Sequence, residues 1–212
     1  MKIQKILLIL FLLLFARTHF TQENFEGKVI FDVQENGKKQ VMDYYAKNKK
    51  YRMEMPDKGG TILFDNNKLM MYVLMDKEKM YIESQMMPLS MSGAGSVSKT
   101  GETKTILGHE CEKFVFEQED LTGEAWMTKD LGAFMFFMES QQDMPSWQQE
   151  IVDAGYFPLQ VTQHSKRDNK TSVYNVIEVT PMDLSDDMFV VPPSYEKLDM
   201  TGLGGLEKLI GK

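Results

Sequence analysis

The 212-residue sequence contains a single cysteine, Cys111, and only three histidines. One cysteine cannot form an internal disulfide, so the stability of the fold must come from side-chain packing. A structural zinc site usually takes about four Cys and His ligands at close spacing, whereas Cys111 and the nearby His109 supply two. We therefore expect neither a disulfide nor a zinc site.

Familiar catalytic motifs and an excess of positive charge are also absent. No G-x-S-x-G, H-E-x-x-H, P-loop or dinucleotide-binding pattern occurs. The 24 lysines and arginines are outnumbered by 31 aspartates and glutamates, which gives a formal net charge of −7. This balance argues against nucleic acid or an anionic membrane surface as the partner. We expect a protein that is not an enzyme, uses no cofactor and binds no nucleic acid.

Long apolar runs are limited to one, near the N-terminus. Lys2 and Lys5 precede the apolar residues 6–15, and small or polar residues begin at Ala16. This is the pattern of a secretory signal peptide, and the run is about half as long as a membrane-spanning helix. We predict a signal peptide over 1–18, a single β-rich domain over 19–200 and a C-terminal tail over 201–212. The mature protein is expected to be periplasmic or secreted, with no integral membrane segment after cleavage.

Alternation of apolar and polar residues dominates the remaining chain. In "KVIFDVQ" the residues Val29, Phe31 and Val33 fall on one face, and "KYRMEM" alternates in the same way. Turn-forming pairs such as Asn36-Gly37 and Asp168-Asn169 separate these segments at the spacing typical of an all-β sheet or barrel. The predicted strands are 27–35, 39–47, 50–55, 61–64, 69–75, 79–84, 104–107, 112–118, 124–129, 159–166 and 171–180.

Three stretches depart from this alternation. Residues 87–102 are rich in Ser and Gly and are predicted to form a mobile loop. Residues 145–155 begin with proline and end with glycine, as a short amphipathic helix does. Residues 134–138 are all apolar, which indicates a segment packed against other apolar surface. We expect a mainly β fold, a curved antiparallel sheet or half-open β-barrel with short helices covering its concave face.

The segment "LGHECEKF" raises the question of a thiol nucleophile at Cys111. Alternation places Phe114 and Phe116 on one face of a strand and Cys111 on the other. A reactive cysteine needs a lowered pKa, whereas the flanking carboxylates of Glu110 and Glu112 would raise it. We therefore interpret Cys111 as a small buried apolar group, and no catalytic residue is predicted.

Methionine is abundant, with 18 residues, and its flexible, polarisable side chain adapts to irregular apolar partners. Two interpretations are ordinary core packing and an apolar cavity that accepts a ligand. The candidate ligand-binding residues are Phe134, Phe137, Met138, Trp126, Met127, Met71, Met75 and Tyr81. A third interpretation is a Cu(I) site formed by the thioethers of Met86, Met87 and Met91.

Four segments together resemble a known family: "TKTILGHECEKFVF", "GEAWMTKDLG", "FPLQVTQHS" and "VYNVIEVTPMDLSDDMFVVPPSYEK". The chain resembles an uncharacterised bacterial envelope family, a domain of unknown function, from about Phe25 to Lys197. That family is itself similar to the LolA/LolB-like lipoprotein carriers. The resemblance implies a half-open barrel of antiparallel strands around an apolar cavity, a fold with which the related carriers hold acyl chains. Unlike LolB-like receptors, this chain has no cysteine directly after its apolar run to carry a lipid.

These features lead to two main hypotheses of function. The first is a soluble exported carrier or binder of a hydrophobic small molecule or lipid, such as the acyl chain of a lipoprotein. The second is an envelope protein-interaction module with a solid core and no ligand, whose partner is another envelope protein. The Met-rich copper binder is a third alternative.

Overall fold

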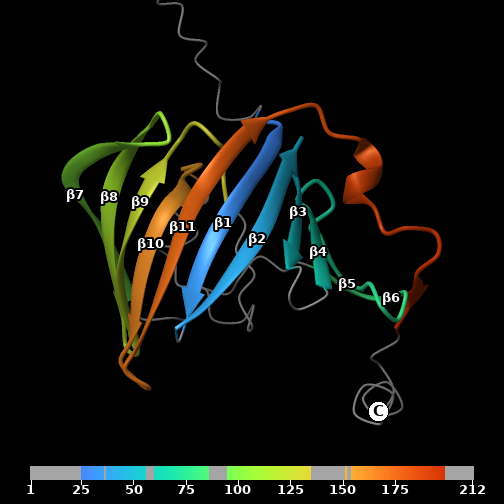
Figure 1. The fold of residues 1–212 in the computed structure, drawn as a ribbon, viewed down its shortest axis with the longest axis horizontal. Coiled ribbons are helices and arrows are strands. Elements are labelled where there is room, and N and C mark those ends of the chain that lie inside the picture. The colour runs from blue at the N-terminus through green and yellow to red at the C-terminus, as the bar shows by residue number, and fades with distance from the viewer. Residues whose placement is uncertain are drawn as a thin grey trace, which may run out of the picture.

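The computed structural model describes residues 25–35, 37–55, 60–85, 95–134, 151 and 154–198. Twelve strands form one sheet in the order β12-β6-β5-β4-β3-β2-β1-β11-β10-β9-β8-β7, and β12 and β7 at the two edges do not pair with each other. Figure 1 shows this sheet curved and strongly twisted. The strands are β1 (Gly27–Glu35), β2 (Lys38–Lys47), β3 (Lys50–Met55), β4 (Gly60–Asp65), β5 (Met70–Met75), β6 (Met80–Gln85), β7 (Gly95–Ile106), β8 (His109–Gln118), β9 (Leu121–Thr128), β10 (Phe157–Ser165), β11 (Lys170–Pro181) and β12 (Glu196–Lys197).

The expected mainly β fold is confirmed, and the predicted strands match well. Strands β1 and β3 have the predicted bounds, and most others differ by one to three residues at an end. Two consecutive sets of antiparallel hairpins, β1 to β6 and β7 to β11, follow the order of the chain. The sequence pattern therefore identified the architecture of a curved, unclosed antiparallel sheet.

The prediction of a mobile loop over 87–102 is wrong for its second half, which lies in β7. This edge strand is polar and exposed along most of its length, so it lacks the apolar alternation that marks the other strands. A register shift between Lys99 and Thr103, together with Gly101 at a φ of 82°, lets the strand bend and continue. Only the pairing with β8 identifies it as a strand.

The centre of the sheet is formed by strands from opposite ends of the chain. β1 pairs antiparallel with β11, with Val29 opposite Val179, and this ladder joins the two sets of hairpins. On its other side β1 pairs with β2, where Val29 lies opposite Tyr44. Because directly opposed residues point to the same face, this register fixes which side chains share a surface.

Cross-strand partners define two faces of the sheet. We call the face that carries Val29, Tyr44 and Met53 the inner face, because these residues oppose one another across β1, β2 and β3 and are almost fully buried. We call the opposite face, with Arg52 opposite Leu63, the outer face. The main hydrophobic cluster of the protein lies on the inner face.

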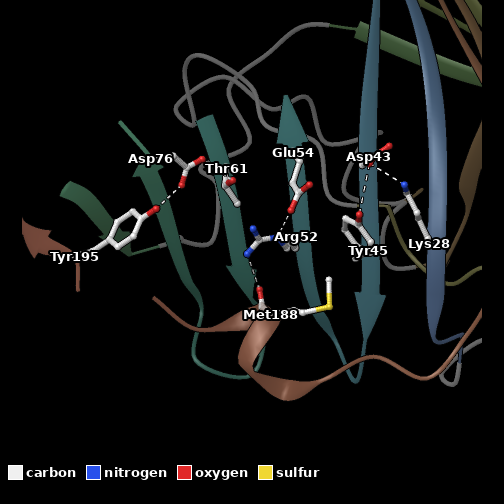
Figure 2. Close-up of polar contacts among 9 residues, drawn as sticks. All are labelled: Lys28, Asp43, Tyr45, Arg52, Glu54, Thr61, Asp76, Met188 and Tyr195. Carbon is white, nitrogen blue, oxygen red and sulfur yellow. Dashed lines mark hydrogen bonds and ion pairs between the residues drawn. The ribbon is translucent and has the colours of Figure 1, made fainter. Parts of the chain in front are cut away.

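The C-terminal segment covers part of the outer face. The 3-10 helix η1 (Asp186–Phe189) packs against β3 and β4, and Arg52 donates a hydrogen bond of 3.0 Å to the carbonyl of Met188. Farther on, the Tyr195 hydroxyl donates to Asp76 at 2.6 Å, and β12 pairs parallel with β6. Figure 2 shows the contacts of Arg52 with Met188 and of Tyr195 with Asp76. This cover explains why the outer-face residues Thr61, Leu63 and Asp65 of β4 are as buried as its inner-face residues.

The expected helices over the concave face are not supported. Within the described ranges, Ile151 is the only residue in an α-helix, and η1 lies on the outer face. Most of the helix predicted over 145–155 falls outside the described residues, as do the signal peptide predicted over 1–18 and the tail predicted over 201–212. No helix in the described part of the chain is long and apolar enough to cross a membrane.

Candidate functional site on the inner face

Four aromatic rings meet at the centre of the inner face. Phe31 comes from β1, Tyr44 from β2 and Phe157 from β10, while Phe134 reaches the same place from the segment after β9. The ring centroid of Phe134 lies 5.0 Å from those of Tyr44 and Phe157 and 5.3 Å from that of Phe31. These are favourable distances for aromatic pairs. We call these four residues the aromatic group.

A broader apolar surface surrounds the aromatic group. Tyr51, Met53, Ile62, Phe64 and Met71 extend it across β3, β4 and β5, and each is at least nine-tenths buried. These residues share one face because side chains alternate between the two faces along each strand. Cross-strand partners such as Tyr51 and Phe64 continue that face from one strand to the next. The inner face is therefore apolar from β5 to β10.

A second cluster lies toward the β7 edge. It contains Phe114, Phe116, Ala125, Met127, Tyr156 and Val161, and we call it the second cluster. The rings of Phe114 and Tyr156 meet edge to face at 4.9 Å. Phe116 is opposite Gly123, and a β-carbon on that glycine would be 2.8 Å from Cε2 of Phe116. Glycine at this position leaves room for the Phe116 ring over the neighbouring strand.

The structure brings some of the predicted ligand-binding residues together and separates others. Phe134 and Met71 both belong to the main inner-face cluster, whereas Met127 belongs to the second cluster. Met75, at the end of β5, is half-buried. Phe137 and Met138 lie outside the described residues, as do Met86, Met87 and Met91 of the suggested copper site.

Trp126 and Tyr81 complete the predicted set. Trp126 is half-buried and packs against the main cluster, and the ammonium of Lys104 lies 4.1 Å from the centroid of its ring. Tyr81 is opposite Leu74, which in turn is opposite Thr61, so Tyr81 lies on the outer face. Alternation within β9 could have placed Trp126 and Met127 on opposite faces of the sheet. It could not assign Tyr81 to a face, because that depends on how β6 pairs with β5.

Cys111 is buried, as the sequence indicates. Its side chain is fully buried in the main cluster, and its thiol donates to the carbonyl oxygen of His109 at 3.6 Å. Burial raises the pKa of the Cys111 thiol to about 11. The His109 ring contacts the carboxylate of Asp130, at 2.9 Å, and not the thiol. A thiol with these surroundings is a poor nucleophile near neutral pH.

A polar network borders the second cluster. Lys99 donates to the Glu112 carboxylate at 2.8 Å and to the Tyr156 hydroxyl at 2.6 Å, and that hydroxyl also donates to Glu112. Lys99, and then Tyr156, hold the pKa of Glu112 below its usual value, while Glu112 and Tyr156 raise the pKa of Lys99. Burial, followed by the hydrogen bond to Glu112, raises the pKa of Tyr156.

Sequence reasoning did not identify this network, because its members come from three separate segments and form no motif. The one available signal was alternation in β8, which places Glu112 on the same face as Phe114. In the ranges described, no group of three or more His, Cys, Asp or Glu residues is placed to hold a metal ion.

Comparison with known proteins gives a family and a fold. A model of the family "Domain of unknown function (DUF4412)" matches residues 25–195, which confirms the predicted membership of an uncharacterised family. No curated protein matches the chain significantly.

Several solved structures are similar to this one at low sequence identity. PNGF-II matches in two crystal forms with TM-scores of 0.56 and 0.54, at 16% and 15% identity, over 89% and 83% of this chain. The matched part covers only 34% and 31% of PNGF-II, about a third of its length. An uncharacterized conserved protein from Thermus thermophilus has a TM-score of 0.52 at 12% identity, covering 84% of this chain and 93% of that one. These likenesses show a shared fold.

A weaker similarity concerns the predicted relation to lipoprotein carriers. A Vibrio parahaemolyticus domain assigned to outer membrane lipoprotein sorting has a TM-score of 0.39 at 7% identity, covering 78% of this chain and 89% of that one. At that TM-score the likeness supports no inference about fold or ligand.

Proposed function

We infer that this chain, which belongs to the DUF4412 family of domains of unknown function, is an exported binder or carrier of a hydrophobic ligand. The ligand class is a lipid or an acyl chain. The observation that carries this proposal is the continuous apolar inner face of a curved sheet that does not close.

The inner face suits an alkyl chain because the side chains on it are mainly apolar, with few polar groups that a ligand would have to satisfy. Each Å² of apolar surface removed from water contributes about 25 cal/mol, so an acyl chain can bind through burial alone. Methionines such as Met53 and Met71 add flexible side chains that adjust to a chain of variable shape. The aromatic group lies at the middle of this surface.

The remaining elements of the proposal concern location and chemistry. The charged start, the apolar run 6–15 and the polar residues after it support export through a cleaved signal peptide to the periplasm or the exterior. The buried Cys111 supports a binding protein rather than an enzyme with a thiol nucleophile.

One observation favours the second candidate, a protein-interaction module without a ligand. Tyr44 and Phe157 have no exposed surface, so the aromatic group is already well packed. In that case the apolar inner face would be core alone, and another envelope protein would contact the exterior of the sheet.

A binding experiment separates the two candidates. The purified protein is extracted with organic solvent and analysed by mass spectrometry, and the delipidated protein is then titrated with a fluorescent alkyl probe. We expect co-purified lipid and saturable probe binding. A protein that yields no lipid and binds no probe would contradict the proposed function and favour the interaction module.

Matched variants locate the binding surface. Phe134→Gln places a polar amide in the aromatic group and is expected to weaken probe binding at least about tenfold. Phe189→Gln is the control, because Phe189 is an equally buried aromatic residue, at 4% exposure against 3%, on the outer face. Both variants lose a buried ring, so thermal unfolding of each shows whether they remain folded at the temperature of the titration. Equal loss of binding in two folded variants would exclude the inner face.

A further inference from the structure

The ring of Tyr156 is contacted by two lysine ammonium groups. Lys99 and Lys129 lie 5.0 Å and 4.8 Å from its centroid, and they come from β7 and from the residue after β9. Tyr156 itself is only 4% exposed and belongs to the second cluster, whereas Lys129 is exposed to solvent. Charge and apolar surface therefore meet at this point.

The two ammonium groups differ in their partners. Lys99 is neutralised by Glu112, at 2.8 Å. Lys129 has no carboxylate within salt-bridge distance among the residues that the structure describes, although acidic residues outnumber basic ones in the whole chain. Near Tyr156 the two lysines and Glu112 together leave one positive charge in excess.

The apolar side of Tyr156 leads directly to the second cluster. Its ring contacts Phe114 at 4.9 Å, and Met127 and Val161 lie in the same cluster. The ammonium of Lys99 is also 5.5 Å from the ring of Phe114. A ligand with one anionic group and one apolar chain matches this arrangement, because its two ends require these two environments.

We propose that the hydrophobic ligand is an anionic amphiphile whose carboxylate or phosphate oxygen pairs with Lys129 beside Tyr156, while its chain lies against the second cluster. This inference rests on the proposed function and adds the headgroup to it. Lys99, the second ammonium near the Tyr156 ring, supports the same anion, and Glu112 opposes it by repulsion.

The test compares two ligands of equal chain length, one with an anionic and one with a neutral headgroup, and an anion without a chain. The delipidated protein is titrated by calorimetry with laurate, with lauryl alcohol and with inorganic phosphate at low ionic strength. We expect laurate to bind about tenfold more tightly than lauryl alcohol, the effect of one charge-assisted contact. Inorganic phosphate is expected to bind far more weakly than either, because it has no chain to bury.

Variants then assign the preference to Lys129. Lys129→Gln should abolish the preference for laurate, Lys129→Arg should retain it, and Glu112→Gln should increase it. Lys104→Gln is the matched control, because the ammonium of Lys104 also lies close to an aromatic ring, that of Trp126. It should leave the preference unchanged.

Each outcome decides between the two proposals. Equal binding of laurate and lauryl alcohol, or a preference that survives Lys129→Gln, overturns the headgroup site but leaves hydrophobic binding intact. Phosphate that binds as tightly as laurate also overturns it, since the site would then take a simple anion. If neither laurate nor the alcohol binds, the proposed function itself fails together with this inference.

Discussion

At the scale of single residues, Cys111 shows how burial determines chemical behaviour. Its thiol has no exposed surface and lies among apolar side chains, which raises its pKa to about 11. At about pH 8, roughly one molecule in a thousand then carries the reactive thiolate, compared with a substantial fraction in an unfolded chain. The folded structure therefore protects the only cysteine of the protein.

This leads to a prediction for thiol labelling. Iodoacetamide at about pH 8 should alkylate Cys111 at least about a hundredfold more slowly in the native protein than in denaturant. Native labelling should accelerate about tenfold for each pH unit up to the folded pKa, because the thiolate is the nucleophile. The label is quantified by mass spectrometry, and Cys111→Ser provides the blank. Rapid labelling of the native protein at neutral pH would show that the thiol is accessible and ionised.

At the scale of elements, one pair in the β8–β9 ladder depends on the absence of a side chain. The Phe116 ring lies over Gly123, and a β-carbon on Gly123 would also overlap the Thr162 carbonyl oxygen of β10. A carbonyl in the middle of a sheet cannot move without breaking its ladder. Glycine here allows three strands to approach closely while the aromatic ring covers the gap.

The corresponding prediction is that Gly123→Ala lowers the free energy of unfolding by about 1–3 kcal/mol, the range for overpacking. Gly60→Ala in β4 is the control, because among the residues that the structure describes a β-carbon there meets only the Leu74 carbonyl, at 3.7 Å. It should be neutral or slightly stabilising, since alanine reduces the freedom of the unfolded chain. Urea denaturation of the two variants measures the difference. Equal stability of both would mean that β8, β9 and β10 rearrange to accept the methyl group.

The sequence was most informative where local pattern and tertiary environment agree. Alternation together with turn residues predicted β1 and β3 with their correct bounds, because each has one apolar face and one polar face. It failed for β7, a polar edge strand that is held by pairing with β8 and not by burial. It also missed β12, whose two residues become a strand only through their contact with β6.

The candidate site was only partly predictable for the same reason. Phe134 and Met71 could be recognised as apolar residues, and both lie in the main inner-face cluster. The pairing of Lys99 with Glu112 and Tyr156 depends on how β7, β8 and the residue before β10 come together. No spacing along the chain encodes that contact, so only the assembled sheet reveals it.

At the scale of the whole molecule, a single ladder connects the two halves of the sheet. β1 and β11 join the strands β2 to β6 to the strands β7 to β10. Val29 lies in this ladder with no exposed surface. The halves therefore share one core, and we expect them to unfold in one cooperative transition.

Val29→Ala tests this coupling. Loss of two buried methyl groups should lower the free energy of unfolding by about 2 kcal/mol. Hydrogen exchange followed by NMR should show the same decrease for the slowest amides of β4 and of β9, although neither strand pairs with β1. Val41→Ala is the control, because Val41 is 42% exposed. A decrease limited to the strands next to β1 would show that the two halves unfold independently.

The position of β1 also has a consequence for biosynthesis. The ribosome makes the chain from its N-terminus, so β1 emerges among the first strands, yet its partner β11 is among the last. Until residues 170–181 have been translated, one edge of β1 remains without its native neighbour. The nascent chain thus cannot complete its central ladder until that segment has left the ribosome, so the two halves of the sheet join only after both have been made.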